Sequence, residues 1–264
     1  MASLLKGVGF ITGAASGIGK ATAQCFARHG VRRLALGDLN IKALGDTATE
    51  LKNTYPWLEI LPLELNAASE ESVEESISAT VKNLGRIDYA VNNAGIAGAA
   101  WKSAESDLAG WQKTLDVNLT GVWLCSRAEI RAMLKQDPLE PDNPRLNRGV
   151  IVNVASMYGV IGTNASVGNV SYTATKHGVV GMTKADAVAY CRQGIRINVM
   201  CPGYVATPLL QNAGPGMQGE IESTPVNRLA SMEEIGDSIV YMASPLSSFM
   251  YGAAMVVDGG YTIQ

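Results

Sequence analysis

The sequence predicts an α/β fold built on a doubly wound parallel sheet, and three observations support this. Short apolar runs typical of strands alternate with longer segments of helical periodicity along all 264 residues. A glycine-rich turn joins the first apolar run to the first helical segment. Polar residues follow several of the apolar runs, at the ends of strands where such sheets bind ligands. The expected strands are 8–12, 33–38, 60–65, 87–92, 150–155, 196–201 and 254–258.

The composition fits one folded domain, which we expect to span residues 1–264 without a linker. Hydrophobic residues make up 47% of the chain and charged residues 17%, so the chain can bury a substantial core. The formal net charge of −3 gives no electrostatic reason to expect nucleic acid or an anionic membrane as partner. A small molecule is therefore the expected ligand.

The cysteines indicate whether a metal site is expected, and the apolar runs and the first residues indicate the cellular location. Cys25, Cys125, Cys191 and Cys201 lack the spacing of a zinc site or of a disulfide framework, so we expect reduced thiols and no metal. No apolar run reaches the ~18 residues of a membrane span, and the glycine turn begins too early to leave room for a signal peptide. These features predict a cytoplasmic protein.

The first candidate site is the glycine-rich turn from Thr12 to Gly19, which reads Thr-Gly-Ala-Ala-Ser-Gly-Ile-Gly. Backbone amides at a helix N-terminus bind a pyrophosphate, and glycines let the phosphates approach the main chain. Such a glycine trio is a weak signal alone, since its spacing differs from the common G-x-G-x-x-G. The strand and helix around it favour a dinucleotide site.

The second strand ends at Asp38, nineteen residues beyond Gly19, where a ribose-binding carboxylate is expected. A 2′-phosphate there would meet a like charge, and neither Ser16 nor Leu39 supplies a compensating cation. The sequence therefore predicts NAD in preference to NADP. A role for Asp38 as the N-cap of the following helix is also compatible with this position.

A phenol and an ammonium lie four residues apart at Tyr172 and Lys176, so on a helix they share one face. A nearby cation lowers the pKa of a phenol, which would make Tyr172 a usable general acid or base. An amphipathic helix with one buried Tyr and one solvated Lys is the alternative. Tyr158 has glycine four residues on, so we expect it to be a wall of the pocket.

Taken in order, these motifs resemble those of the short-chain dehydrogenase/reductase family along nearly the whole chain. The run 12–19 is similar to the family's T-G-x-x-x-G-x-G, and 92–95 (Asn-Asn-Ala-Gly) to its N-N-A-G. The resemblance implies a Rossmann-like seven-stranded sheet of order 3-2-1-4-5-6-7 with helices on both faces, and a homotetramer or homodimer. The residues that match the family's catalytic tetrad are Asn118, Ser156, Tyr172 and Lys176.

The resemblance also implies the reaction, the interconversion of a secondary alcohol and a ketone with NAD. Tyr172 would be the general acid or base, and Ser156 would stabilise charge on the substrate oxygen. Lys176 would lower the pKa of Tyr172 and bind the nicotinamide ribose, and Asn118 would relay protons through a water. The expected cofactor-binding residues are Gly13, Ser16, Gly17, Ile18, Gly19, Asp38, Leu39, Asn66, Ala67, Asn93, Ala94, Gly95, Tyr172, Lys176, Pro202, Gly203, Val205 and Thr207.

The substrate pocket is expected to be apolar or aromatic, which suits a cyclic substrate. The residues expected to line it are Met157, Tyr158, Ile161, Tyr204, Leu209 and Leu210. Residues 207–228 would form a lid over the substrate. The stretch 162–169, where the chain is longer than is usual in the resembled family, would border the mouth of the pocket. The proline-rich loop 136–148 would lie at the strands' amino ends, opposite the site.

Three points remain open at this stage. The same scaffold can serve an isomerase, epimerase or cyclase that needs no net redox reaction, or a dinucleotide-binding sensor or scaffold. Asn92 and Asn93 are as well suited to fixing local structure as to contacting a ligand. Asn66 replaces the family's Asp beside the adenine, and its amide can still hydrogen-bond there.

Overall fold

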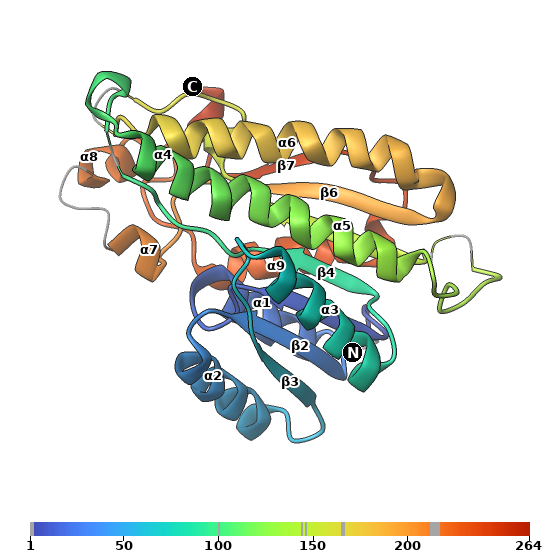
Figure 1. Cartoon of the computed structure of the whole chain (residues 1–264). Helices are drawn as coiled ribbons and strands as arrows, with labels where there is room; N and C mark the ends of the chain where they lie inside the picture. Colours follow the sequence, from blue (N-terminus) through green and yellow to red (C-terminus); the bar gives the residue numbers. More distant parts are fainter. Residues whose placement is uncertain (1–2, 100, 144, 146, 165–166, 212–216) are drawn as a thin grey trace.

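The computed structural model describes residues 3–99, 101–143, 145, 147–164, 167–211 and 217–264. Seven strands, all paired in parallel, form one sheet in the order β3-β2-β1-β4-β5-β6-β7, which confirms the predicted fold class (Figure 1). Each expected strand is present, with boundaries within two residues of those predicted. The strands are β1 (Val8–Thr12), β2 (Arg33–Asp38), β3 (Glu59–Glu64), β4 (Tyr89–Asn92), β5 (Gly149–Val154), β6 (Ile195–Pro202) and β7 (Ala254–Val257).

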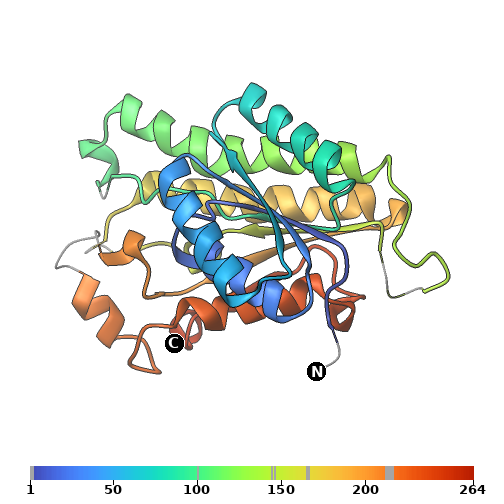
Figure 2. The same cartoon turned by 90° about the horizontal axis from the view of Figure 1, so that it is seen from below.

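Helices cover both faces of this sheet, as Figure 2 shows. On one face Phe26 of α1 and Ile239 of α9 belong to a buried cluster, and on the other face Leu124 of α5 belongs to a second cluster. Adjacent residues of a strand point to opposite faces, so in β1 Phe10 packs into the second cluster and Ile11 into the first. The helices are α1 (Gly17–Arg28), α2 (Ile41–Thr54), α3 (Glu70–Leu84), α4 (Leu108–Leu115), α5 (Gly121–Met133), α6 (Val170–Tyr190), α7 (Pro208–Gln211), α8 (Met217–Glu222) and α9 (Met232–Ala243).

The helical run after β4 contains a wider turn than the sequence predicts. Helix α4 passes into a π-helical turn at Asp116–Thr120 before α5 begins. In this turn the amide of Gly121 donates to the carbonyl of Asp116, a spacing of five residues instead of four. The apolar periodicity of the sequence predicts one regular helix from about residue 107 to residue 135, and the structure interrupts that helix at Asn118, one of the predicted site residues.

The amino ends of the strands are tied together by buried and partly buried polar contacts. Arg196 at the start of β6 is buried, and its guanidinium donates to the carbonyls of Met242, Ala243 and Ser244 at the end of α9. Gln136, at the start of the proline-rich loop, donates from Nε2 to the carbonyl of Ile87 at 2.6 Å. This contact confirms that the loop begins beside the amino ends of the strands.

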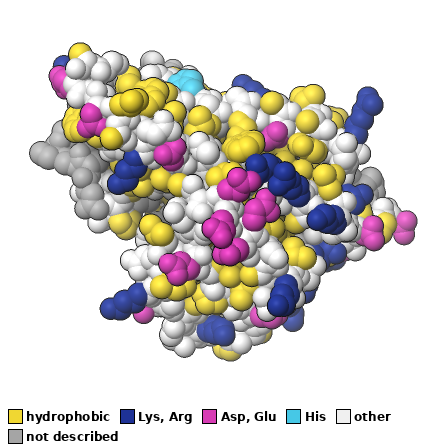
Figure 3. Space-filling model, viewed as in Figure 1, with side chains coloured by type: hydrophobic (Ala, Val, Ile, Leu, Met, Phe, Trp, Pro, Cys, Tyr) yellow, Lys and Arg dark blue, Asp and Glu magenta, His cyan; other side chains and the backbone are white. Residues whose placement is uncertain are grey.

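On the face shown in Figure 3, acidic and basic side chains lie beside one another among hydrophobic ones. Arg127 of α5 pairs with Glu70 of α3 at 2.5 Å, and Arg131 pairs with Glu74 at 3.0 Å. These exposed pairs join α5 to α3, and each contributes at most about 1 kcal/mol.

Parts of three predicted loops lie outside the described residues: 212–216 of the expected lid, 165–166 of the loop before α6, and residues 144 and 146 of the proline-rich loop. The described part of the lid includes α7 and α8. Within the described ranges, the helices are all too short or too polar to cross a membrane.

Candidate active site

A largely apolar pocket lies at the carboxyl ends of the central strands. Its walls come from the segments that follow β4, β5 and β6, from the start of α6 and from α7. Fifteen residues expected at the site line it: Ile18, Asn93, Gly95, Ser156, Met157, Tyr158, Tyr172, Lys176, Pro202, Gly203, Tyr204, Val205, Thr207, Leu209 and Leu210.

Ser156 and Tyr172 meet on the wall of this pocket. Ser156 follows the end of β5, and its hydroxyl accepts a hydrogen bond from the amide of Tyr158 at 3.2 Å. Tyr172 lies in the first turn of α6, which begins after Asn169 caps it by accepting from the Tyr172 amide. The Ser156 hydroxyl also lies close enough to the Tyr172 phenol to lower its pKa.

Lys176 lies one turn further along α6 and is buried behind Tyr172. Its ammonium donates to the carbonyl of Val154 at 2.9 Å, and Nζ is 5.4 Å from the centroid of the Tyr172 ring. The predicted juxtaposition of phenol and ammonium is therefore present. The helical spacing of four residues produces it.

The net pKa shift of Tyr172 is upward, whereas the sequence predicts a lowered pKa; the contribution of Lys176 itself stays a prediction. Burial raises the pKa of Tyr172 to about 12, and the neighbouring Ser156 hydroxyl acts in the opposite direction. Burial also lowers the pKa of Lys176 to about 8. Desolvation disfavours the charged forms of both residues, and Ser156 is the group that favours the phenolate.

Asn118 joins this group through the π-helical turn. Its side chain is fully buried and forms two hydrogen bonds with Ile96, from Nδ2 to the carbonyl and from the Ile96 amide to Oδ1, both at 2.8 Å. A Cβ atom on Gly95 would lie 3.2 Å from Oδ1 of Asn118 and 3.8 Å from Nζ of Lys176. Asn118 and Lys176 thus flank the same glycine.

The glycine-rich turn leaves main-chain amides accessible at the start of α1. Gly13 and Gly17 have φ values of +66° and +58°, a region that favours glycine. A Cβ atom on Gly19 would lie only 2.2 Å from the Gly13 carbonyl, so the helix packs closely on the turn. The hydroxyl of Ser16 makes no capping hydrogen bond, and Ile18 lines the pocket. The turn therefore offers the donors that a pyrophosphate requires.

Asp38 is fixed at the carboxyl end of β2 beside this turn. One carboxylate oxygen accepts from the amide of Ala15 at 3.0 Å, and the other accepts from the amide of Asn40 at 2.9 Å. Asn40 caps α2 by accepting from Ala43, so the alternative role of Asp38 as N-cap is wrong. Leu39 next to it is exposed.

Several other predicted cofactor residues have structural partners here. Asn66 accepts from the amide of Ala68, and the carbonyl of Ala67 would lie 2.9 Å from a Cβ on Gly121. Asn93 donates to the carbonyls of Thr12 and Gly13 at 3.1 and 3.2 Å. The contacts of Asn93 hold the glycine turn to the end of β4, and the amide of Ala94 donates to the Thr12 hydroxyl beside them.

Asn92 faces away from the pocket into a buried polar network. Its Nδ2 lies within hydrogen-bonding distance of Ser126, Glu129 and Asn153, and Asn153 donates to Thr183 at 2.9 Å. We call these five residues the core network. Burial raises the pKa of Glu129 to about 8, so its carboxyl is neutral at neutral pH.

Ile161 packs against the buried cluster that contains Tyr158 and Tyr204 and does not belong to the pocket lining. The pocket is also lined by six residues that the sequence does not predict: Ile96, Ala97, Val154, Ala155, Val167 and Asn169. Asn169 could have been found, because an Asn just before an apolar helical period is a strong N-cap signal.

The chain was compared with known proteins. A family model described as "Enoyl-(Acyl carrier protein) reductase" matches residues 13–262. The chain is 39% identical over 270 residues to "Short-chain dehydrogenase srdC" of Neurospora crassa, covering 98% of each chain. It is 36% identical over 256 residues to the cyclohexanol dehydrogenase of an Acinetobacter species, covering 97% of this chain and 94% of the relative. A crystal structure of a short-chain type dehydrogenase/reductase from Mycobacterium marinum matches with a TM-score of 0.90 at 33% identity, covering 99% of this chain and 98% of that one.

Proposed function

The chain belongs to the short-chain dehydrogenase/reductase family, and from this premise we propose that it is an NAD-dependent enzyme that interconverts a ring-bearing secondary alcohol and its ketone. The observation that carries the proposal is the placement of Ser156 and Tyr172 together on the wall of a largely apolar pocket, with Lys176 one helical turn beyond Tyr172. The cyclohexanol dehydrogenase among the relatives supports a ring substrate.

Each residue of the pair has a distinct task in alcohol oxidation. Tyr172 takes the proton of the substrate hydroxyl, and Ser156 donates a hydrogen bond to the substrate oxygen as charge develops on it. In the reverse direction Tyr172 returns the proton to the ketone oxygen. Asn118 and Lys176 adjoin Gly95 behind the pair, where they carry the proton onward through water.

A nicotinamide dinucleotide supplies the hydride acceptor or donor when it is bound. The amides at the start of α1 would hold its pyrophosphate, and Asp38 would hold the adenosine ribose. Lys176 would hold the nicotinamide ribose. The close approaches at Gly13 and Gly19 fit this group, because any larger side chain would disturb the cradle.

The proposal predicts NAD in preference to NADP by at least about tenfold, or ~1.4 kcal/mol, because Asp38 would repel the phosphate of NADP. Replacing Asp38→Ala together with Leu39→Arg should shift the preference toward NADP. The measurement is kcat/KM from the absorbance of reduced nicotinamide, with both cofactors and a panel of ring secondary alcohols.

The same assay tests the alternative functions. An isomerase, epimerase or cyclase would convert its substrate without a net change in nicotinamide absorbance, and a sensor would bind the dinucleotide without turnover. Reduction of NAD by none of the alcohols, and oxidation of NADH by none of the ketones, would contradict the proposal.

A further inference from the structure

Beside the reacting pair, the pocket has a second polar feature made of phenols. Tyr158 and Tyr204 both line the pocket, and their hydroxyl oxygens are 2.6 Å apart. Tyr261, from the C-terminal segment, packs edge-to-face on Tyr204 with ring centroids 5.4 Å apart. We call these three residues the tyrosine cluster.

The tyrosine cluster is fixed from behind by α8 and by the loop before α6. The hydroxyl of Tyr261 donates to the carboxyl of Glu220 at 2.5 Å. Asn164 donates to both Glu220 and Tyr261, at 2.7 Å each. The phenols are therefore held in place by their neighbours before any substrate enters.

The position of Tyr158 relates the cluster to the reaction. Tyr158 follows Ser156 by two residues, and its amide donates to the Ser156 hydroxyl. The segment 156–158 thus carries both Ser156, which would contact the reacting oxygen, and Tyr158 of the tyrosine cluster. Phenylalanine could fill the same space with an apolar ring, whereas these positions hold phenols.

The phenols of the cluster are uncharged at neutral pH. Burial raises the pKa of Tyr158, Tyr204 and Tyr261 above that of an ordinary phenol. Of the described residues that line the pocket, Lys176 is the one with a cationic side chain, and it lies behind Tyr172 at the other polar feature. A carboxylate of the substrate near the phenols would lack a counter-charge.

Resting on the function proposed above, we propose that the hydroxyls of Tyr158 and Tyr204 form a second subsite that binds a neutral oxygen of the substrate. The substrate class is then a ring alcohol, or its ketone, that carries an additional hydroxyl or carbonyl group away from the reacting carbon. A phenol both donates and accepts, so the subsite suits either group.

The first test uses the unmodified enzyme. We expect the best of the isomeric cyclohexanediols to exceed cyclohexanol in kcat/KM by about tenfold or more. The bond between the Tyr158 and Tyr204 hydroxyls uses one of their two O–H donors, and cyclohexanol offers the other donor no second oxygen. We expect a hydroxycyclohexanecarboxylate to fall below that diol. Equal values for cyclohexanol and every diol would overturn the subsite while leaving the proposed function intact.

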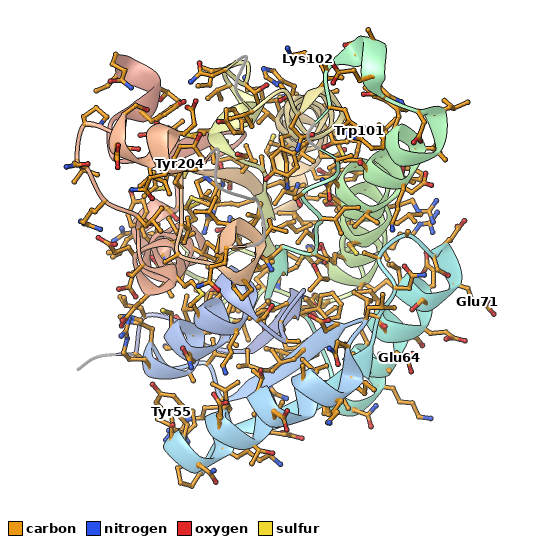
Figure 4. All side chains as sticks on the ribbon, turned by 90° about the vertical axis from the view of Figure 1, so that its left-hand side faces the viewer. Tyr55, Glu64, Glu71, Trp101, Lys102 and Tyr204 are labelled. Atoms are coloured by element: carbon orange, nitrogen blue, oxygen red, sulfur yellow. The ribbon has the colours of Figure 1, made fainter. Side chains whose placement is uncertain are left out.

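The second test uses the variants Tyr158→Phe and Tyr204→Phe. Each should reduce the ratio of diol to cyclohexanol kcat/KM toward one, while thermal unfolding reports whether the variant folds. The matched control is Tyr55→Phe, the same change at a distant tyrosine, as Figure 4 shows for Tyr55 and Tyr204. It should leave the ratio unchanged.

Further results would count against the subsite. An unchanged ratio in both folded pocket variants would refute it, as would an equal loss in the control. Absence of turnover with cyclohexanol and with every diol would refute the proposed function, and the subsite, which rests on that function, would be refuted as well.

Discussion

Two groups of buried polar side chains flank the end of β5, and they differ in whether they reach the pocket. The core network includes Asn92 and Glu129 and is sealed between the sheet and helices α5 and α6. The tyrosine cluster reaches the pocket wall and ends on Glu220. In the core network one oxygen each of Asn92 and Glu129 has no hydrogen-bond partner among the described residues.

The difference shows how the chain separates structure from chemistry. Groups that exchange protons with a substrate need access to the pocket, and Tyr172 has it. Glu129 is ionisable too, yet it lies where its proton serves to keep a buried carboxyl neutral. Variants on the two sides should therefore alter different quantities, activity on one side and stability on the other.

The largest effect is expected at the pocket. Tyr172→Phe removes the proton carrier and should lower kcat by about 10²–10⁴, with the NAD affinity and the free energy of unfolding nearly unchanged. In the wild type, oxidation should accelerate as pH rises from about 6 to 9, because the phenol with a pKa of about 12 is mostly protonated there. Reduction needs the protonated phenol and should not accelerate. Steady-state rates measure both, and a near-normal rate in the variant would rule out Tyr172 as the acid or base.

A smaller effect, on stability, is expected in the core network. Glu129 has a folded-state pKa of about 8 against a reference value of 4.5, so between these pH values the folded protein holds a proton that the unfolded chain loses. Its contribution to stability therefore falls as pH rises. Glu129→Gln cannot ionise and should be the more stable protein at pH 8 by about 1–3 kcal/mol, with a smaller difference at pH 5.

Denaturant unfolding at both pH values measures this, with kcat as the control that should change little. Identical pH dependence in wild type and variant would show that Glu129 does not hold the extra proton. A large loss of kcat in a stably folded variant would erase the distinction between the two groups.

The smallest effect is expected at Asn169, which belongs to both sides of the comparison. It lines the pocket, yet its side chain caps α6 at Tyr172 and donates to the carbonyl of Ala97 at 2.6 Å. Asn169→Ala should cost about 0.5–2 kcal/mol of stability, as the loss of an N-cap does, and Asn169→Asp should recover part of it. Thermal unfolding of the three proteins compares these values, and equal stability of Ala and Asn would show that the cap contributes nothing.

Much of the fold could be predicted because its signals are local. Apolar runs such as 8–12 and 196–201 mark buried strands, and the glycine turn and the spacing of Tyr172 and Lys176 locate the site. Burial is not local, which is why the raised pKa of Tyr172 was missed. The single domain over 1–264, the homotetramer or homodimer and the cytoplasmic location stay predictions.

The features that the sequence does not predict depend on contacts between residues distant in the sequence. Glu129 occupies a helix whose pattern does not reveal that its carboxyl lies against Asn92. Glu220 and Tyr261 lie 41 residues apart in the sequence, and only the tertiary fold brings them together. The π-helical turn at 116–120 has no signal in propensity, since the same residues fit a regular helix.

The π-helical turn at Asp116–Thr120 limits which insertions and deletions this part of the chain can accept. A π turn is a helix with one residue added, and each residue of an α-helix turns by about 100°. Loss of a single codon between Asp116 and Thr120 could restore a regular helix, but it would rotate α4 against α5 by roughly that angle. Either Asn118 would leave Ile96 or Glu129 would leave Asn92. We therefore expect lineages of this protein to conserve the length of this stretch strictly while surface loops gain and lose residues.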